Sequence, residues 1–470
     1  KGYEGTSSIS HNDMQDVLLE NTLSYNRDIG VHSLNGLLGY TRQQITWNND
    51  MVETRGYATD AFTYYNIDAG TERSDARSGN REQGLESYLF RANYIYNSKY
   101  FLTASARLDG SSVFAKNNKW GLFPSVAVAW RASNESFIED LGVFDNLKVR
   151  ASYGLLGNPG LNPGASLSRL AQGGNNYILG VNQNVVSGIA ANSLGNPNLK
   201  WETTKQLNIG FDAAFFNWRL QVTLDYYNKM TEDLLVEVPL LWLTSFATSL
   251  SNYGSVSNNG LELTINSVNL STNNFRWETT FNLAGNRNKI EELLAPEGQI
   301  IINNFGWGNS SGILKEGHPI GTFYGMVQDG IWNSQEEIDA AGLTGHGVFP
   351  GGKRYKDLDG DGVIDRTLDR KIIGDANPDF FGGMINTFFY KGFELFVNFS
   401  FVYGNHIYNQ TTETFGTAFD TNVYAKFADR WTPENSDSNI PSIAGIPGKI
   451  CRDLNETFMV AHLLCVIFKA

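Results

Sequence analysis

The chain has 470 residues, a formal net charge of −13 and 13% aromatic residues. This acidic balance excludes a general nucleic-acid-binding role, which requires basic patches that neutralise phosphates. No run of about 18 consecutive apolar residues occurs, so no transmembrane helix is expected. The two cysteines, Cys451 and Cys465, lie near the carboxyl end and form no CxxC pair, so neither a disulfide framework nor a zinc site is predicted.

Long strands with alternating residue types are the main predicted elements. Over residues 100–109, for example, apolar residues occupy the even positions 102 to 108 and polar residues the odd positions 103 to 109. Strict alternation predicts a strand with one apolar and one polar face. The same pattern predicts strands over residues 16–26, 31–43, 85–97, 100–109, 122–132, 147–155, 205–216, 218–229, 260–269, 275–287, 380–390 and 393–403. Strands of this length suit a tilted membrane strand, which needs about 9–11 residues, better than a soluble one.

The predicted connections are of two kinds. Tight turns are expected at 97–99, 216–217, 271–273 and 390–392, whereas long segments are expected at 45–83, 154–204, 231–258 and 288–379. Short turns on one side and long loops on the other are typical of an outer-membrane barrel with the long loops outside. The sequence therefore predicts an all-β fold, an antiparallel transmembrane β-barrel. A large soluble β-sandwich or propeller is the alternative that this pattern leaves open.

One acidic loop, KDLDGDGVIDRTLDR at residues 356–370, has the spacing of a metal site. Asp357, Asp359 and Asp361 follow the 1-3-5 pattern of an EF-hand loop, with Gly362 at position 6. The remaining candidate calcium ligands are the Val363 carbonyl, Asp365 and Asp369. The usual carboxylate at position 12 is replaced by leucine, and the acid comes one residue later. The alternative is an Asp/Gly-rich turn held by side chain to backbone hydrogen bonds without metal.

No enzyme is predicted, because the six histidines lack metal-ligand spacing and no GxSxG, P-loop or dinucleotide motif occurs. No cofactor is required, and calcium is the one candidate. Aromatic residues in the predicted long loops are candidate contacts for a sugar or a partner protein. They are Trp242, Tyr253, Trp307, Tyr324 and Trp332. The alternative is that these rings only pack the loops together.

Several segments together resemble the SusC/RagA family of TonB-linked outer-membrane receptors. They are RLDGSSVFAKNNKWGLFPSVAVAWRASNESF at 107–137, LKVRASYGLLGN at 147–158, NPNLKWETTKQLNIGFD at 196–212, IGTFYGMVQDGIW at 320–332 and YKDLDGDGVIDRTLDRKIIGDANPDFFGGMINTFFYKGFEL at 355–395. They follow one another in the order of the family and span most of residues 30–435. The combination is much more specific than any single motif.

The resemblance implies a 22-stranded barrel, of which this chain would supply about 12–14 strands. It implies TonB-dependent import of large nutrients, oligosaccharides or peptides, across the cell outer membrane. The implied partners are outer-membrane lipid, a SusD-like surface lipoprotein, and the TonB complex acting through a plug domain that residues 1–470 do not contain. We therefore expect residues 1–440 to form an incomplete receptor barrel.

Residues 441–470 depart from the family pattern and form an atypical tail, which a frameshifted or truncated gene would explain. Two other functions stay open. One is a passive porin or β-barrel adhesin. The other is a secreted calcium-binding, carbohydrate-binding β protein, which would stay soluble without detergent.

Overall fold

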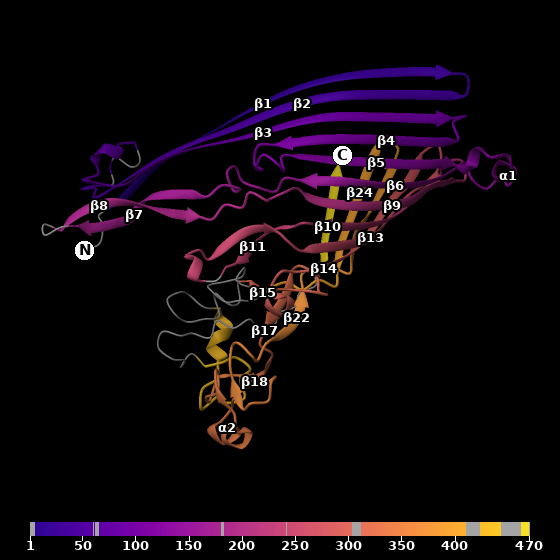
Figure 1. Cartoon of the computed structure of the whole chain (residues 1–470). Coiled ribbons are helices and arrows are strands. Elements are labelled where there is room, and N and C mark those ends of the chain that lie inside the picture. Colours follow the sequence, from indigo (N-terminus) through magenta and orange to yellow (C-terminus); the bar gives the residue numbers. More distant parts are fainter. Residues whose placement is uncertain are drawn as a thin grey trace. The chain divides into compact units, whose positions relative to one another are not determined.

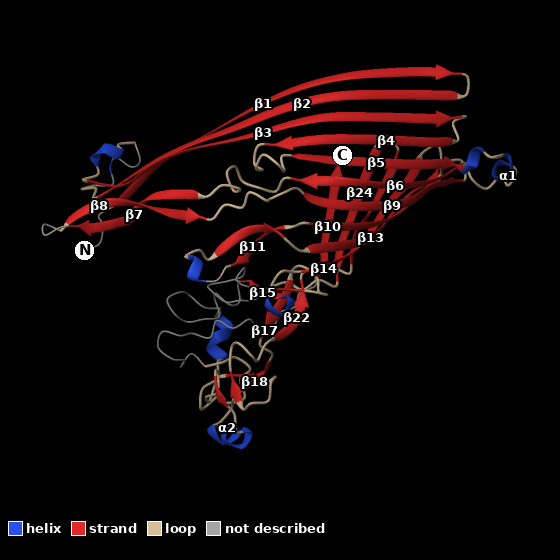
Figure 2. Ribbon diagram, viewed as in Figure 1, coloured by secondary structure: helices blue, strands red, loops and turns tan. Residues whose placement is uncertain are grey.

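The computed structural model describes residues 5–59, 61, 65–179, 183–240, 242–302, 312–409, 424–442 and 462–469. Within them, strands predominate and almost all pair antiparallel (Figures 1 and 2). The largest sheet described has 13 strands, in the order β1-β2-β3-β4-β5-β6-β9-β10-β13-β14-β23-β24-β25. The prediction of an antiparallel all-β fold with about a dozen long strands is confirmed.

The strands of the large sheet are β1 Thr6–Ile29, β2 His32–Arg55, β3 Glu72–Tyr96, β4 Tyr100–Ser111, β5 Trp120–Arg131, β6 Asn146–Asn158, β9 Glu202–Phe215, β10 Leu220–Glu232, β13 Ser255–Ser271, β14 Phe275–Glu292, β23 Phe380–Tyr390, β24 Phe393–Tyr403 and β25 His462–Lys469. The bounds of β23 and β24 agree with those predicted from the alternation. Strand β25 lies in the predicted atypical tail and pairs antiparallel with β24. Its continuous apolar run gave no alternation from which a strand could be predicted.

Smaller sheets and short helices occupy the connections. The strands are β7 Arg169–Leu179, β8 Asn184–Ser193, β11 Leu235–Pro239, β12 Thr248–Asn252, β15 Gln299–Ile302, β16 Gly312–Lys315, β17 Thr322–Gly325, β18 Gln328–Ile331, β19 Thr344–Gly345, β20 Lys353–Tyr355, β21 Val363–Ile364 and β22 Lys371–Asp375. The helices are α1 Ser136–Glu139, α2 Gln335–Ala341, η2 Ile67–Ala69, η3 Ala132–Asn134, η4 Trp242–Thr244, η5 Pro296–Gly298 and η6 Ala425–Asp429. The Ser334 hydroxyl caps α2 by accepting a hydrogen bond from the Glu337 amide.

The chain forms two compact units. Unit 1 contains Lys1–Glu135, Lys148–Asn208 and Thr231–Tyr253, and unit 2 contains Ser136–Leu147, Ile209–Met230 and Gly254–Ala470. Each unit is described by itself below. Unit 1 includes β1–β5 and the hairpins β7–β8 and β11–β12. Unit 2 includes the strands from β13 onward and the small sheets between β14 and β23.

The predicted loop at residues 45–83 is wrong, because β2 and β3 continue through most of it. The two strands stay paired from His32↔Tyr96 out to Arg55↔Glu72, which leaves residues 56–71 as the connection. Most side chains in the extended parts of β1–β3 are exposed. Because neither face is buried there, the sequence has no reason to alternate, and alternation was the signal used for the prediction.

Two bands of aromatic side chains cross one face of β2–β5. They consist of Tyr40, Tyr88 and Trp120 near one end and of His32, Tyr96 and Tyr100 near the other. The step from Tyr88 to Tyr96 is eight residues along β3. This corresponds to about 26 Å along the strand, or about 20 Å in height at a tilt of roughly 40°. The spacing is close to the apolar band of about 25 Å between the aromatic girdles of outer-membrane barrels.

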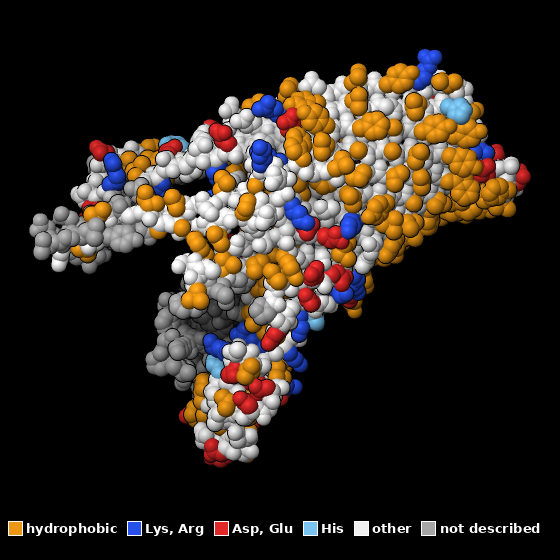
Figure 3. Space-filling model, in the orientation of Figure 1, with side chains coloured by type: hydrophobic (Ala, Val, Ile, Leu, Met, Phe, Trp, Pro, Cys, Tyr) orange, Lys and Arg blue, Asp and Glu red, His pale blue; other side chains and the backbone are white. Residues whose placement is uncertain are grey.

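Between the two bands the same face is apolar and exposed. Its side chains, each at least 44% exposed, include Leu34, Leu38, Phe90, Leu102, Leu122, Val126 and Val128. Figure 3 shows hydrophobic side chains spread over this part of the strands, with few charges among them. An apolar surface this continuous is unfavourable in water and suits contact with lipid. Among the described residues, no helix is long and apolar enough to span a membrane.

A buried cluster packs the longer connections of unit 1 together, at the end of the strands opposite the short turns. It contains Val113, Phe114, Phe123, Leu161, Leu199 and Trp201. The Trp201 ring lies 5.2 Å from Phe114 and 5.6 Å from Phe123, measured between centroids. Its indole N–H donates to the Lys119 carbonyl at 3.1 Å. The cluster therefore holds segments from three connections, around residues 113, 161 and 200, in one arrangement.

Candidate functional site

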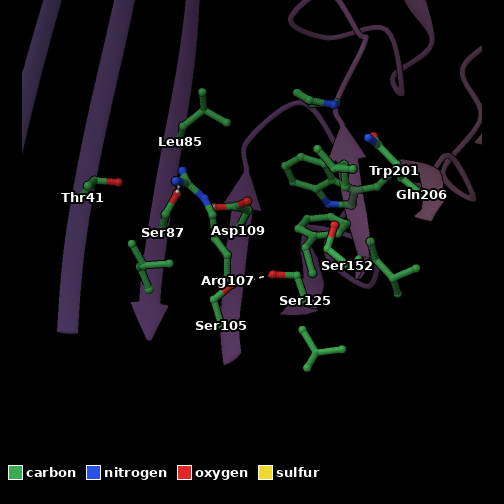
Figure 4. Close-up of a pocket in the computed structure, with 18 of the residues that line it drawn as sticks. Thr41, Leu85, Ser87, Ser105, Arg107, Asp109, Ser125, Ser152, Trp201 and Gln206 are labelled. Atoms are coloured by element: carbon green, nitrogen blue, oxygen red, sulfur yellow. Dashed lines mark hydrogen bonds and ion pairs between the residues drawn. The ribbon is translucent and has the colours of Figure 1, made fainter. Parts of the chain in front are cut away.

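A hollow of about 830 Å³ lies in unit 1, on the face of the sheet opposite the aromatic bands (Figure 4). The alternation of β4 places its odd-numbered, polar residues on this face, and Ser105, Arg107 and Asp109 line the hollow. Other polar lining residues are Glu20, Thr41, Gln43, Ser87, Ser125, Ser152, Gln206 and Asn208. Polar residues from neighbouring strands thus meet in one hollow, together with apolar residues such as Leu85 and Leu89.

Arg107 is the central charged group of this surface. Its Nε donates to Asp109 Oδ1 at 2.6 Å, and one of its terminal nitrogens donates to Ser87 Oγ at 3.0 Å. The side chains of Arg107 and Asp109 are 49% and 16% exposed. Because the pair is open to solvent, it contributes little to stability. It leaves the guanidinium with further N–H donors for a ligand.

Uncharged hydrogen-bonding groups surround this pair. The hydroxyls of Ser105 and Ser125 lie 2.7 Å apart across β4 and β5. Asn208 Nδ2 donates to Ser152 Oγ at 3.3 Å, and Gln206 Nε2 donates to Asn208 Oδ1 at 2.8 Å. Hydroxyl and amide side chains can donate and accept at once, so this surface can bind the hydroxyl groups of a sugar or the amides of a peptide.

The aromatic part of the lining is fixed by close packing. Phe123 and Trp201 line the hollow and belong to the buried cluster. A Cβ placed on Gly157 would lie 1.9 Å from Cζ of Phe123. A glycine is required there, because any side chain would displace the ring from the wall of the hollow.

The acidic loop of unit 2 brings three carboxylates together. One oxygen from each of Asp357, Asp359 and Asp361 lies within 4.8 Å of the others. The turn depends on Gly360 and Gly362, whose φ angles of +78° and +82° favour glycine. The amides of these two glycines donate to the Asp357 carboxylate at 2.6 and 2.9 Å. The triad is thus arranged by the backbone and can offer oxygen ligands to a divalent ion such as Ca²⁺.

The other two predicted acidic ligands have backbone partners. Asp369 is fully buried, and its two oxygens accept from the amides of Leu358 and Asp365 at 2.6 and 2.8 Å. The Asp365 carboxylate accepts from the amides of Thr367 and Leu368 at 2.5 and 2.7 Å. Both residues therefore shape the loop and lie outside the group of three carboxylates. A role as metal ligands stays a prediction for them and for Val363.

Electrostatics set the members of the triad apart. Hydrogen bonds from the Gly362 amide and its neighbours hold the pKa of Asp357 below its ordinary value. For Asp359, the hydrogen bond from the Asp361 amide acts in the same direction. Some loss of hydration and the adjacent carboxylates of Asp361, Asp369 and Asp357 outweigh it and raise the pKa of Asp359. Converging negative charge of this kind is what a bound cation would relieve.

The loop aromatics fall into different environments. Trp307 lies outside the described residues, and for Trp242 the structure describes only the backbone, in η4. Tyr253 and Tyr324 are half-buried. Trp332 is only 2% exposed and packs beneath the Arg354 guanidinium, whose carbon lies 5.6 Å from the ring centroid. This burial favours a packing role for Trp332, and contact with a ligand stays a prediction for all five residues.

Comparison with known proteins settles the family. The model of the family described as "TonB dependent receptor-like, beta-barrel" matches residues 2–363. The chain belongs to this family. It is 36% identical over 444 residues to TonB-dependent receptor P3 of Formosa agariphila, covering 94% of this chain and 44% of that protein. It is 27% identical over 413 residues to TonB-dependent receptor SusC of Bacteroides thetaiotaomicron, covering 86% of this chain and 39% of SusC.

The fold of the receptor is also found among solved structures. A structure titled as that of the RagAB peptide transporter superposes with a TM-score of 0.77 at 23% identity, covering 93% of this chain and 47% of that one. The predicted resemblance to SusC/RagA receptors is thereby confirmed, and the chain is an outer-membrane β-barrel protein. It spans about half the length of the curated relatives it matches. These relatives are named as receptors, not as enzymes.

Most of the lining of the receptor's hollow was not named from the sequence. Glu20, Thr41 and Gln206 come from strands far apart in the chain and meet only through the pairing of the sheet. The alternation did contain a signal, because each residue is on the polar side of its strand. What it could not give was the register that brings these polar rows together.

Proposed function

We propose that this receptor chain is part of a TonB-dependent importer that carries large polar nutrients, oligosaccharides or peptides, across the outer membrane. The observation that carries the proposal is the hollow of about 830 Å³, which lies on the opposite face of the sheet from the aromatic bands and the apolar surface between them. Its position on the polar face of the sheet suits a surface that contacts cargo, or a plug domain, inside a barrel. The solved RagAB structures are titled as a peptide transporter and peptide importer, which supports peptides as one cargo class.

The chemistry of the lining supports an uncharged, hydrogen-bonding cargo. Among the polar lining residues, serine, threonine, asparagine and glutamine predominate, and Arg107 is already paired with Asp109. Hydrogen bonds between neutral groups contribute only about 0.5–1.5 kcal/mol each. Several such weak contacts would bind a long sugar or peptide and still release it, as transport requires.

The partners proposed for the complete receptor follow its family. A SusD-like surface lipoprotein would cover the outer end, and the TonB complex would act through a plug domain. We propose Tyr253 and Tyr324 as contacts for the cargo or a partner protein, because their described side chains are only half-buried. Trp242 and Trp307 remain candidates on sequence grounds.

Uptake of fluorescent oligosaccharides and peptides by cells that carry the receptor tests this proposal. Import should stop when an uncoupler removes the proton-motive force, and Arg107→Gln should slow import of the accepted cargo. Arg276→Gln is the matched control, because Arg276 pairs with Glu278 and does not line the hollow. Uptake that continues unchanged with the uncoupler would instead support a passive porin.

We further propose that the acidic loop binds Ca²⁺ through Asp357, Asp359 and Asp361, as a structural staple of the connection between β14 and β23. The convergence of the three carboxylates, with the EF-hand spacing and the glycine at position 6, supports this proposal. Calorimetric titration of Ca²⁺ should give binding heat that Asp359→Ala abolishes. If the native sequence gives no binding heat, the loop is instead an Asp/Gly-rich turn that binds no metal.

A further inference from the structure

A second hollow, of about 250 Å³, lies on the other face of unit 1, beside the aromatic band of Tyr40, Tyr88 and Trp120. Strand register defines its position. In the register of the sheet, Arg42 lies opposite Glu86, Glu86 opposite Gly110, and Gly110 opposite Trp120. These four residues form one row across β2–β5. This row lies one step beyond Tyr40 and Tyr88, on the side away from the short turns. We call it the upper hollow.

The depth of the upper hollow follows from the connections. The turns at residues 30–31 and 97–99 are short, whereas residues 56–71 and 112–119 form longer connections at the opposite end. In outer-membrane barrels the short turns face the periplasm and the long loops face outward. The upper hollow is therefore at the level of the outer-leaflet headgroups, directly above the apolar face that suits lipid chains.

The charges of the upper hollow favour an anion. Arg42 and Lys119 both line it, and neither has an ion pair among the residues that the structure describes. Glu86 also lines it, but its carboxylate accepts from the hydroxyls of Tyr88 and Tyr40 at 2.9 and 3.4 Å. The lining thus contains two cations and one carboxylate, and the aromatic band engages that carboxylate. A guanidinium and an ammonium that line the same hollow suit a phosphate group.

We propose that the upper hollow binds the phosphorylated sugar headgroup of an outer-leaflet glycolipid. Arg42 and Lys119 would contact the phosphate, and the exposed ring of Trp120 would pack against the sugar. The apolar face next to the hollow favours a phosphorylated lipid over free phosphate as the ligand. Leu38 and Phe90 are 54% and 48% exposed directly below the band, where acyl chains continuing from the headgroup would lie. The proposal rests on the outer-membrane location of the receptor and does not depend on what it imports.

Binding of a defined lipid to the full chain in a neutral detergent tests the proposal. The probes are an acylated, phosphorylated diglucosamine and the same lipid without phosphate, titrated by native mass spectrometry. The phosphorylated lipid should bind at least tenfold more tightly. Arg42→Gln and Lys119→Gln should each weaken it about tenfold, as expected for loss of a charge-assisted hydrogen bond. Binding of the lipid without phosphate should not change.

Two further variants make the test specific. Arg27→Gln is the matched control, because Arg27 is exposed on the same face, paired with Leu34, but at the end near the short turns. It should leave binding unchanged. Glu86→Gln should tighten binding, because it removes the one negative charge of the hollow and keeps an acceptor for the tyrosine hydroxyls. This gain cannot be produced by misfolding.

Three results would overturn the proposal. One is equal affinity for the phosphorylated and unphosphorylated lipids. A second is an equal loss in the Arg27→Gln and Arg42→Gln variants. The third is displacement of the lipid by millimolar inorganic phosphate, which would identify the hollow as a site for the free ion.

Discussion

Replacement of Leu199 by alanine should loosen the buried cluster that holds the connections of unit 1. Leu199 has no exposed surface and packs in the cluster with Val113, Phe114, Leu161 and Trp201. Truncation of a fully buried leucine removes its transfer free energy and leaves a cavity, at a cost of about 2–5 kcal/mol. A loss of about 3 kcal/mol would raise the fraction of open molecules roughly 150-fold.

Hydrogen exchange of backbone amides measures this opening segment by segment. Residues 112–119 and 159–167 should exchange much faster in Leu199→Ala, because both segments contribute to the cluster. The strands between the aromatic bands should keep their protection, since the cluster lies outside that region. Trp201 lines the large hollow, so the same variant should also weaken cargo import.

Leu167→Ala is the control for this experiment. Leu167 belongs to the same connection but is 63% exposed, so its truncation should change stability by no more than about 0.5 kcal/mol. If Leu199→Ala and Leu167→Ala exchange at equal rates over residues 112–119, the cluster does not hold the connections and the reasoning is refuted.

Three further predictions concern other elements. Gly157→Ala should destabilise unit 1 by about 1–3 kcal/mol in chemical denaturation, because its Cβ would lie 1.9 Å from the Phe123 ring. Gly36→Ala is the control, because a Cβ there meets nothing within 4 Å and Gly36, like Gly157, has no positive φ. Ser334→Ala should cost about 1 kcal/mol through the lost helix cap, seen as faster exchange of α2 amides, and Ser334→Asp should restore it. Because the pKa of Asp359 is raised above 3.8, its contribution to stability is present at lower pH and is lost as the pH rises through the folded value. Asp359→Asn should therefore protect residues 356–370 near neutral pH without Ca²⁺, and added Ca²⁺ should protect only the native loop; equal protection of both proteins by Ca²⁺ would contradict the triad as its site.

The sequence determined the strands wherever one face is apolar and the other polar. Strands β23 and β24 have the predicted bounds. Strands β4 and β5 each begin and end within two residues of their own predicted bounds. The family motifs identified the kind of receptor, and the acidic loop was found from its spacing alone.

Tertiary structure decided what depends on register and on contacts between distant segments. The extensions of β1–β3 lack alternation, so only their pairing reveals them as strands. The two hollows exist because pairing aligns residues from separate strands, with Arg107 beside Ser87 on one face and Arg42 opposite Glu86 on the other. Alternation gives the two faces of a strand, but the neighbours that each side chain meets are set by hydrogen bonds between strands, which no local pattern records.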